Sequence, residues 1–432
     1  MLRFRWEREN ASGVVRTVKI GIVTTWFERG AAYVSRQYRD LLRAEHEVVI
    51  YARGGEASGR GDPHWDGDDV TWGRSVPTHG NTAFHLGHFR RWLRRERPDL
   101  VLFNEQQWWA PVLLCRDLGI RTAAYVDYYT EATVPLFANY DLLLCHTRRH
   151  HSVFDWHPGC VYMPWGTRTD RFLPASEEPV HAGCVTFFHN AGLNPQRKGT
   201  EFLLEAFLRL ERSARLVIHS QRPLDERLFD WTSRIRELEA SARLELRVGD
   251  VPPPGLYHLG DVYVYPTRLE GLGLTVAEAI SCGLPAIVPD CPPMSELVSP
   301  EAGRSVAVKR YQPRRDGYYW PQCLVDVEDL LRQMDWYCAN AERLPELKRS
   351  AREHAVCNLD WARNGKQLPR ILERATRLDG AEQARAREAA LQFENQRVDV
   401  RLFYPLMTRL LLKSADLLRP LASRYSGRLR RP

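Results

Sequence analysis

Short apolar runs rich in β-branched residues alternate with helical stretches along most of this chain, and this alternation limits the possible folds more than any other feature. Residues 18–25 are predicted to be a buried strand, the segment after it contains Gly30 and opens a helix, and residues 46–51 are predicted to be the next strand. Strand, helix and strand in that order predict a right-handed parallel crossover. The same pattern predicts further strands at 99–103, 122–126 and 141–145. A doubly wound sheet is therefore expected.

A second series of the same kind follows residues 174–179, a polar stretch that begins and ends in proline and predicts a linker. Apolar residues recur at helical spacing within 200–210, which favours a helix packed on a sheet. A chain of 432 residues is too long for one ordinary core and suits two α/β domains. Strands of this second series are predicted at 185–188, 215–219, 243–248, 262–265 and 286–288.

These boundaries divide the chain into two similar domains with short additions at each end. Both domains are predicted to be Rossmann-like α/β domains with parallel sheets. The predicted parts are an N-terminal extension (1–17), a first domain (18–174), a second domain (180–360), a closing helix (361–377) and a basic amphipathic helical tail (380–432).

The net charge of +7 arises almost entirely from the C-terminal tail. Residues 401–432 contain eight basic residues and one acid, which leaves 53 residues of each sign in the rest of the chain. This distribution argues against nucleic acid as a partner of the body of the protein. Nine cysteines without a C-x-x-C pair argue against a disulfide framework or a zinc site.

The tail also shows leucines on one helical face and basic residues on another, between residues 402 and 421. Such a basic amphipathic helix suits an anionic membrane surface, packing on the first domain, or a protein partner. No uninterrupted apolar run reaches the ~18 residues that cross a bilayer, and residues 1–17 lack the apolar run of a signal peptide. We therefore expect a cytoplasmic protein, at the inner face of the membrane if the tail binds it.

Residues 261–298 contain the strongest local signal for chemistry. A strand that ends near residue 265 leads into a loop with Gly271 and Gly273, and a helix is expected to begin near Thr275. Glycines allow close approach of a ligand, and the first amides of a helix suit a diphosphate. Glu270 and Glu278 flank this junction and are expected to face one pocket. Thr275 and Glu278 also have the spacing of a capping box, which would need no ligand.

This stretch resembles the donor-binding signature of retaining glycosyltransferases of the GT-B fold, family 4. Glu270 and Glu278 match its E-x7-E spacing, and the S-C-G-L-P run at 281–285 and Glu296 follow as in the family. The run 161–174, V-Y-M-P-W-G-T-R-T-D-R-F-L-P, is similar to its interdomain segment, and Q-R-K-G-T at 196–200 is similar to its phosphate-binding turn. The resemblance implies two Rossmann-like domains that face each other across a cleft.

By resemblance, the donor is a nucleotide diphosphate sugar, and Glu278 contacts its ribose while Glu270 contacts its sugar. Lys198 and Arg197 would pair with the diphosphate, together with the amides near Leu274 and Thr275. Gly30 would approach the phosphates from the first domain. Residues around Val251 would lie near the base. The implied acceptor is a glycan, a lipid-linked glycan or a small molecule, and the implied outcome is retention.

Three departures from the family pattern limit this interpretation. The family's arginine upstream of Lys198 is missing from the segment 189–193, and Arg197 is the candidate to replace it. The interdomain asparagine is Trp165 here. No histidine follows the strand at 122–126, so Asp127 is the candidate at that position. Trp108 and Trp109 either stack on an acceptor sugar or pack in the core.

We expect no metal and no bound cofactor. The only D-x-D letters that we note, Asp66-Gly-Asp68, lie in a polar loop far from the donor motif. Two alternatives of other classes remain: a catalytically silent GT-B protein that binds nucleotide sugars as a scaffold, and a nucleotide-sugar epimerase.

Overall fold

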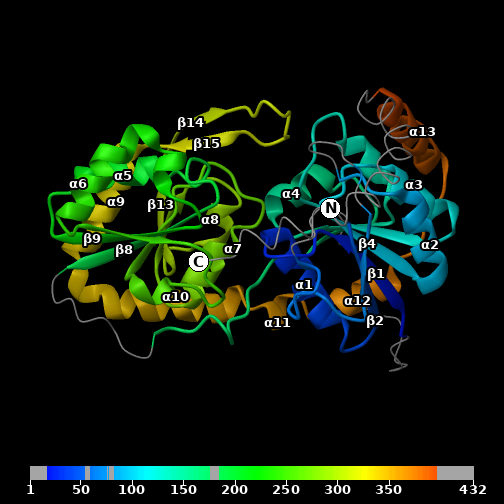
Figure 1. Ribbon diagram of the computed structural model, residues 1–432, viewed down its shortest axis with the longest axis horizontal. Helices are drawn as coiled ribbons and strands as arrows, with labels where there is room; N and C mark the ends of the chain where they lie inside the picture. Colours follow the sequence, from blue (N-terminus) through cyan, green and yellow to red (C-terminus); the bar gives the residue numbers. More distant parts are fainter. Residues whose placement is uncertain (1–16, 54–58, 75, 77–81, 176–183, 397–432) are drawn as a thin grey trace, which may run out of the picture. The chain divides into compact units, whose positions relative to one another are not determined.

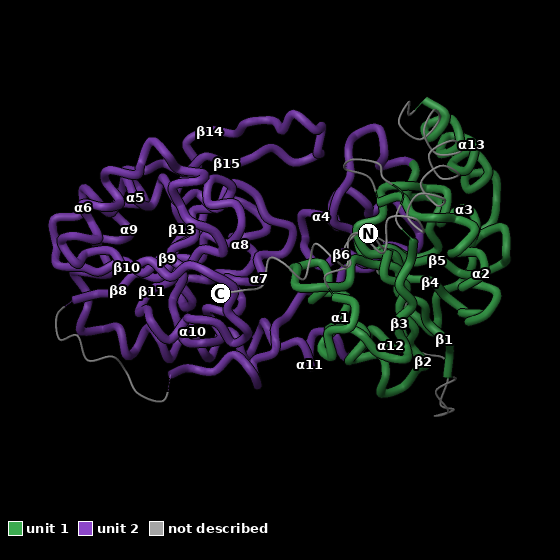
Figure 2. The backbone as a smooth tube through the Cα atoms, viewed as in Figure 1, with its two compact units in different colours: residues 1–125, 136–142, 367–432 green, residues 126–135, 143–366 purple. Residues whose placement is uncertain are grey.

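The computed structural model describes residues 17–53, 59–74, 76, 82–175 and 184–396. Within these ranges the chain forms two parallel sheets, with helices on both faces of each, as the alternating pattern predicts (Figure 1). The expected fold class is confirmed. By its internal contacts the chain divides into two compact units, which comprise residues 1–125, 136–142 and 367–432, and residues 126–135 and 143–366 (Figure 2). Residues 143–174 thus group with the second unit, although the sequence assigned them to the first domain.

The first sheet has seven strands in the order β3-β2-β1-β4-β5-β6-β7. Helices α1 and α12 contact each other, as do α2 and α3. Its strands are β1 (Lys19–Thr24), β2 (Glu47–Ala52), β3 (Val70–Trp72), β4 (Leu100–Asn104), β5 (Arg121–Tyr125), β6 (Leu142–Cys145) and β7 (Cys160–Tyr162). The associated helices are α1 (Gly30–Leu42), α2 (Leu86–Glu96), α3 (Ala110–Asp117), α4 (Arg148–Phe154), α12 (Leu368–Arg374) and α13 (Ala381–Gln396).

The second sheet has six strands in the order β10-β9-β8-β11-β12-β13. Its apolar side chains form two clusters, one beneath α5, α6 and α9 and the other beneath α7 and α10. Its strands are β8 (Val185–Gly192), β9 (Ala214–Ser220), β10 (Leu244–Val248), β11 (Val262–Val264), β12 (Ala286–Pro289) and β13 (Gly303–Val306). Its helices are α5 (Thr200–Leu208), α6 (Thr232–Ala240), α7 (Leu274–Ser281), α8 (Met294–Leu297), α9 (Val327–Ala339), α10 (Leu344–Asn358) and α11 (Trp361–Asn364).

A separate antiparallel hairpin, β14 (Val308–Gln312) and β15 (Gln322–Val325), leaves the second sheet after β13 (Figure 1). The sequence pattern did not reveal this hairpin or the short strands β3, β7 and β13, because strands of three to five residues carry too little periodicity. Short 3-10 turns complete the described structure: Val134–Asn139, Leu224–Glu226, Phe229–Trp231, Tyr257–Leu259 and Ala341–Arg343.

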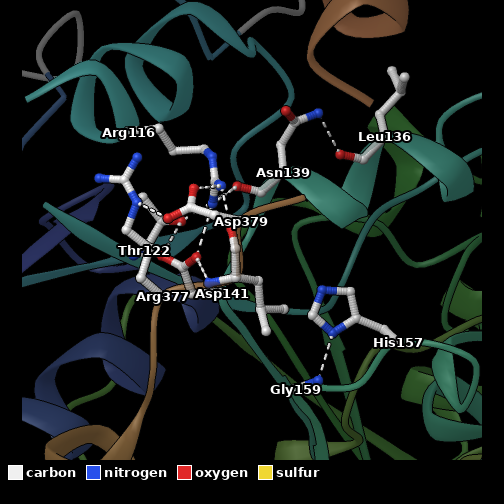
Figure 3. A network of polar contacts seen from close by, with 10 residues as sticks. Arg116, Thr122, Leu136, Asn139, Asp141, His157, Gly159, Arg377 and Asp379 are labelled. Atoms are coloured by element: carbon white, nitrogen blue, oxygen red, sulfur yellow. Dashed lines mark hydrogen bonds and ion pairs between the residues drawn. The ribbon is translucent and has the colours of Figure 1, made fainter. Parts of the chain in front are cut away.

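The C-terminal segment returns to the first unit and is fastened there by a buried ion-pair network (Figure 3). Arg116 donates to Asp141 at 2.8 Å, and both side chains are buried. Asp141 also accepts the amide of Leu378, and Arg116 reaches Asp379 at 3.3 Å. A buried arginine needs such partners because an unpaired charge is costly in an apolar core. The network therefore joins the segment after α12 to the sheet.

The predicted tail is described only in its first part, where α13 buries Ala386 and Ala390. The amphipathic stretch between residues 402 and 421, on which the membrane prediction depends, lies outside the described residues. Among the described residues, no helix combines the length and the apolar character that crossing a membrane requires.

Candidate active site

The predicted donor residues gather at the carboxyl ends of β8 and β11. These two strands are neighbours at the point where the strand order of the second sheet reverses. In doubly wound sheets this switch point is where ligands bind. Arg197 and Lys198 immediately precede α5, and Glu270 lies in the loop between β11 and α7. All three residues belong to the second unit.

The carboxylate of Glu270 is the centre of a buried polar cluster. Its Oε1 accepts hydrogen bonds from Lys198 Nζ at 2.7 Å and from the hydroxyls of Thr267 at 2.8 Å and Tyr265 at 3.0 Å. Its Oε2 lies 3.3 Å from Arg197 Nη1. Lys198 also donates to the Tyr265 hydroxyl and lies over its ring. The cluster thus holds two cations beside one anion, so it keeps one positive charge.

Burial and charge act in opposite directions in this cluster. Burial favours a raised pKa of Glu270, but the charges of Arg197 and Lys198 outweigh it and lower that pKa to about 2. Burial lowers the pKa of Lys198 to about 8, although the Glu270 carboxylate opposes the shift. Near neutral pH the carboxylate is therefore ionised and the lysine protonated.

The turn that carries the two cations depends on one glycine. Gly199 has φ +70° and precedes α5, and an added Cβ would lie 2.0 Å from the carbonyl oxygen of Pro266. The helix start therefore packs directly against the end of β11. His189, in the segment without the family's arginine, is buried and contacts Thr200 Oγ1 at 2.8 Å and the Val264 carbonyl at 2.7 Å. It fastens α5 to β11.

Helix α7 begins at Leu274, after Gly273 with φ +77°. This left-handed conformation favours glycine, and an added Cβ would also displace the end of the Met294 side chain, whose Cε would lie 2.3 Å away. No side chain caps the helix, and Thr275 lies in its first turn. The capping-box interpretation of Thr275 and Glu278 is therefore wrong.

Glu278 lies in the second turn of α7, not in the first as the sequence suggested. Its Oε2 accepts a hydrogen bond from the Tyr257 hydroxyl at 2.6 Å. Burial raises the pKa of Glu278 to about 7, against the opposing effects of Tyr257 and of the Arg171 charge. Burial raises the pKa of Tyr263 well above its usual value, and the charges of both Glu278 and Glu270 add to that shift. The charges of the two glutamates therefore both raise the pKa of the same buried tyrosine.

Asp127 follows β5 and belongs to the second unit. Glu270 is the main cause of the raised pKa of Arg197, and the charge of Asp127 contributes to it as well. The carbonyl of Asp127 accepts a hydrogen bond from the Tyr318 hydroxyl at 3.1 Å. The structure thus brings Asp127 within electrostatic range of the cationic pair.

The remaining predicted positions lie in loops or at the start of a helix. Gly30 is the first residue of α1, after Arg29 in an extended conformation. Gly271 lies between Glu270 and the start of α7, and Val251 is exposed in the loop after β10. Their roles toward a ligand stay predictions.

Two other sequence motifs have structural roles. Trp108 and Trp109 are buried, with Phe84 and Phe137 as ring neighbours, so they pack in the core. Asp66 accepts hydrogen bonds from Trp72 Nε1 and the Gly61 amide, both at 2.7 Å, and so shapes its own loop.

Arg149 is a site residue that sequence reasoning missed. It is buried in α4 and donates to the main-chain carbonyls of Glu270 and Pro292. Glu296 accepts the first two amides of this helix, from Arg148 at 2.6 Å and from Arg149 at 2.9 Å. No local pattern could have identified Arg149, because its partners lie more than a hundred residues away.

Comparisons with known proteins bear on the family of the second-sheet region and on the fold. Residues 185–315 match the family model described as glycosyl transferases group 1. The fold is similar to sucrose-phosphate synthase from Thermosynechococcus elongatus (TM-score 0.62, 16% identity, 82% of this chain and 98% of that chain). It is also similar to Anabaena Alr3699/HepE in complex with UDP (0.66, 14%, 82% and 99%) and to the pneumococcal O-GlcNAc transferase GtfA in complex with UDP and GlcNAc (0.61, 12%, 83% and 99%). No curated protein sequence matches the chain.

The fold, the switch-point site and the family match together define the class: the chain is a glycosyltransferase with the GT-B fold. Its second-sheet region, residues 185–315, is a group 1 glycosyltransferase domain.

Proposed function

We propose that this enzyme moves a sugar from a nucleoside diphosphate sugar to a glycan, glycolipid or small-molecule acceptor, with retention of the anomeric configuration. The observation that carries the proposal is the Lys198, Arg197 and Glu270 cluster at the switch point, beside the start of α7. The similar structures of HepE and GtfA contain UDP, which supports a nucleotide sugar as the donor.

In the proposed reaction the bond between the anomeric carbon and the diphosphate oxygen breaks, and a bond to the acceptor hydroxyl oxygen forms. The acceptor proton passes to the departing phosphate. Negative charge therefore grows on the diphosphate, where Lys198, Arg197 and the first amides of α7 supply fixed positive potential. Lys198 is held in place for this role by the ion pair to Glu270. Glu278 is the proposed acceptor of ribose hydrogen bonds.

Nucleotide release from UDP-, GDP- and ADP-sugars, measured with and without cell-envelope extract, tests this proposal. We expect release from one donor family, stimulated by the extract, and its loss in Glu278→Ala. Glu226→Ala, an exposed glutamate elsewhere in the second unit, is the matched control and should behave as wild type. Binding without release under all conditions identifies a silent scaffold and contradicts the proposal. Conversion of the donor sugar without release identifies an epimerase.

The pKa values of the site predict a narrow pH optimum. Glu278, with a pKa of about 7, accepts ribose hydrogen bonds more strongly when it has lost its proton, so kcat/KM should rise as pH increases through 7. Lys198, with a pKa of about 8, must keep its proton to bind phosphate, so kcat/KM should fall above pH 8. A pH series of initial rates should show a maximum between these values.

The variant Tyr257→Phe tests whether Glu278 sets the acidic limb of the pH profile, which is the rise of kcat/KM below the optimum. The lost hydroxyl stabilises the ionised form of Glu278, so its removal raises the pKa of Glu278 and moves that limb to higher pH. The alkaline limb, which Lys198 sets, should stay in place. If the acidic limb stays unchanged in this variant, another group controls it.

A further inference from the structure

The hairpin β14–β15 crosses the end of the part of the chain that matches the family model. The match ends at residue 315, inside the loop that joins β14 and β15. The end of that loop, residues 316–320, has the sequence D-G-Y-Y-W. Tyr318 is buried, whereas Tyr319 is 42% exposed. The aromatic tip of the hairpin and β15 therefore lie beyond the matched region.

The hairpin tip is fastened to the segment after β5. Thr130 and Tyr318 form an antiparallel bridge, and the Tyr319 amide donates to the Tyr129 carbonyl at 2.9 Å. Trp320 Nε1 donates to the Tyr129 hydroxyl at 2.6 Å. The rings of Tyr128 and Tyr318 stack, with centroids 5.2 Å apart. The tip and residues 128–130 thus form one surface, which belongs to the second unit.

This surface adjoins the candidate active site in two places. The Tyr318 hydroxyl donates to the carbonyl of Asp127, the residue that lies within electrostatic range of Arg197. Arg149 lies over the Trp320 ring at 5.3 Å and donates to the carbonyl of Glu270. A molecule on the hairpin tip would therefore lie beside the proposed donor site.

The hairpin also carries excess positive charge. Residues 308–325 contain four basic residues and one acid, Asp316. Arg314 pairs with Asp316 at 2.9 Å, while Lys309, Arg310 and Arg315 are exposed. The charge therefore favours a negatively charged ligand, and guanidinium groups match carboxylates in geometry.

We propose that the hairpin tip, with Tyr128, binds the acceptor, and that this acceptor is an acidic saccharide. Aromatic rings pack against the apolar C–H faces of sugar rings while their polar edges stay hydrated, and the exposed arginines pair with sugar carboxylates. This inference rests on the proposed function, because the surface gains an acceptor role only beside a donor site.

Calorimetric titration of the full chain with galacturonic acid hexasaccharide tests the inference, and maltohexaose is the neutral control of equal length. We expect the acidic hexasaccharide to bind at least about tenfold more tightly. Tyr128→Ala and Tyr319→Ala should each weaken that binding about tenfold, and Arg315→Gln should weaken it less and reduce its salt dependence. Phe229→Ala, which removes an exposed aromatic ring elsewhere in the second unit, should leave it unchanged.

The inference is overturned if neither saccharide binds, if both bind equally, or if the hairpin variants bind as tightly as wild type. Tyr319→Ala keeps the main-chain bond to Tyr129, so this variant decides the outcome if Tyr128→Ala does not fold. UDP titration of the same variants separates the two proposals. Intact nucleotide binding with unchanged saccharide binding contradicts only the hairpin role, whereas absent nucleotide binding and turnover in wild type contradict the proposed function.

Discussion

Lys198→Ala is expected to lower the rate of sugar transfer about 10²- to 10³-fold, because it removes the main cation that we propose acts at the leaving diphosphate. The side chain is 12% exposed and is held by Glu270 and the Tyr265 hydroxyl, so the charge is fixed before the donor binds. Arg197 remains in the variant, but its side chain is 39% exposed and better screened by water. Steady-state kinetics with saturating donor measure this effect.

Lys348→Ala is the matched control for this variant. Lys348 pairs with Asp261 at 2.8 Å, and the side chains are 17% and 11% exposed, close to the values for Lys198 and Glu270. Asp261 lies just before β11, however, whereas Glu270 lies beyond its other end. Both variants should lose similar stability on thermal melting, and only Lys198→Ala should lose turnover. Equal rates in the two variants would exclude Lys198 from the reaction.

Gly199→Ala is expected to destabilise the second unit by about 3–5 kcal/mol and to abolish transfer. The left-handed conformation at φ +70° costs an alanine about 1–2 kcal/mol, and its Cβ would lie 2.0 Å from a main-chain oxygen that cannot move without displacing β11. Relief of this overlap must shift the turn that carries Lys198. Urea denaturation and turnover measurements test both effects.

Gly255→Ala separates the steric overlap from the backbone strain. Gly255 has φ +80° and belongs to the same unit, but an added Cβ would meet only the Tyr257 ring at an ordinary 3.5 Å. Its expected cost is therefore only the strain of about 1–2 kcal/mol. Equal destabilisation by the two substitutions would show that Gly199 does not pack against β11 as described.

The motif between β11 and α8 could be predicted from the sequence because it is local. Glu270, Gly273 and Leu274 lie within one strand-loop-helix unit, and their order alone places them at one end of the sheet. The same local reasoning failed for Thr275 and Glu278. Their spacing fits a capping box with Thr275 as the N-cap, but the N-cap is Gly273, two residues earlier, and Glu278 contacts Tyr257 instead.

The sequence by itself determined the two parallel sheets and the glycine turns, because period and backbone conformation are properties of neighbouring residues. The tertiary structure decided which groups from distant parts of the chain lie close enough to form contacts and to shift one another's pKa values. The pKa values of Lys198 and Glu270 depend on charges far apart in the chain. The hydrogen bond from Arg149 to the Glu270 carbonyl and the contact of the hairpin with residues 128–130 also connect distant segments. Such contacts depend on how the strands are ordered in space, which no local pattern contains.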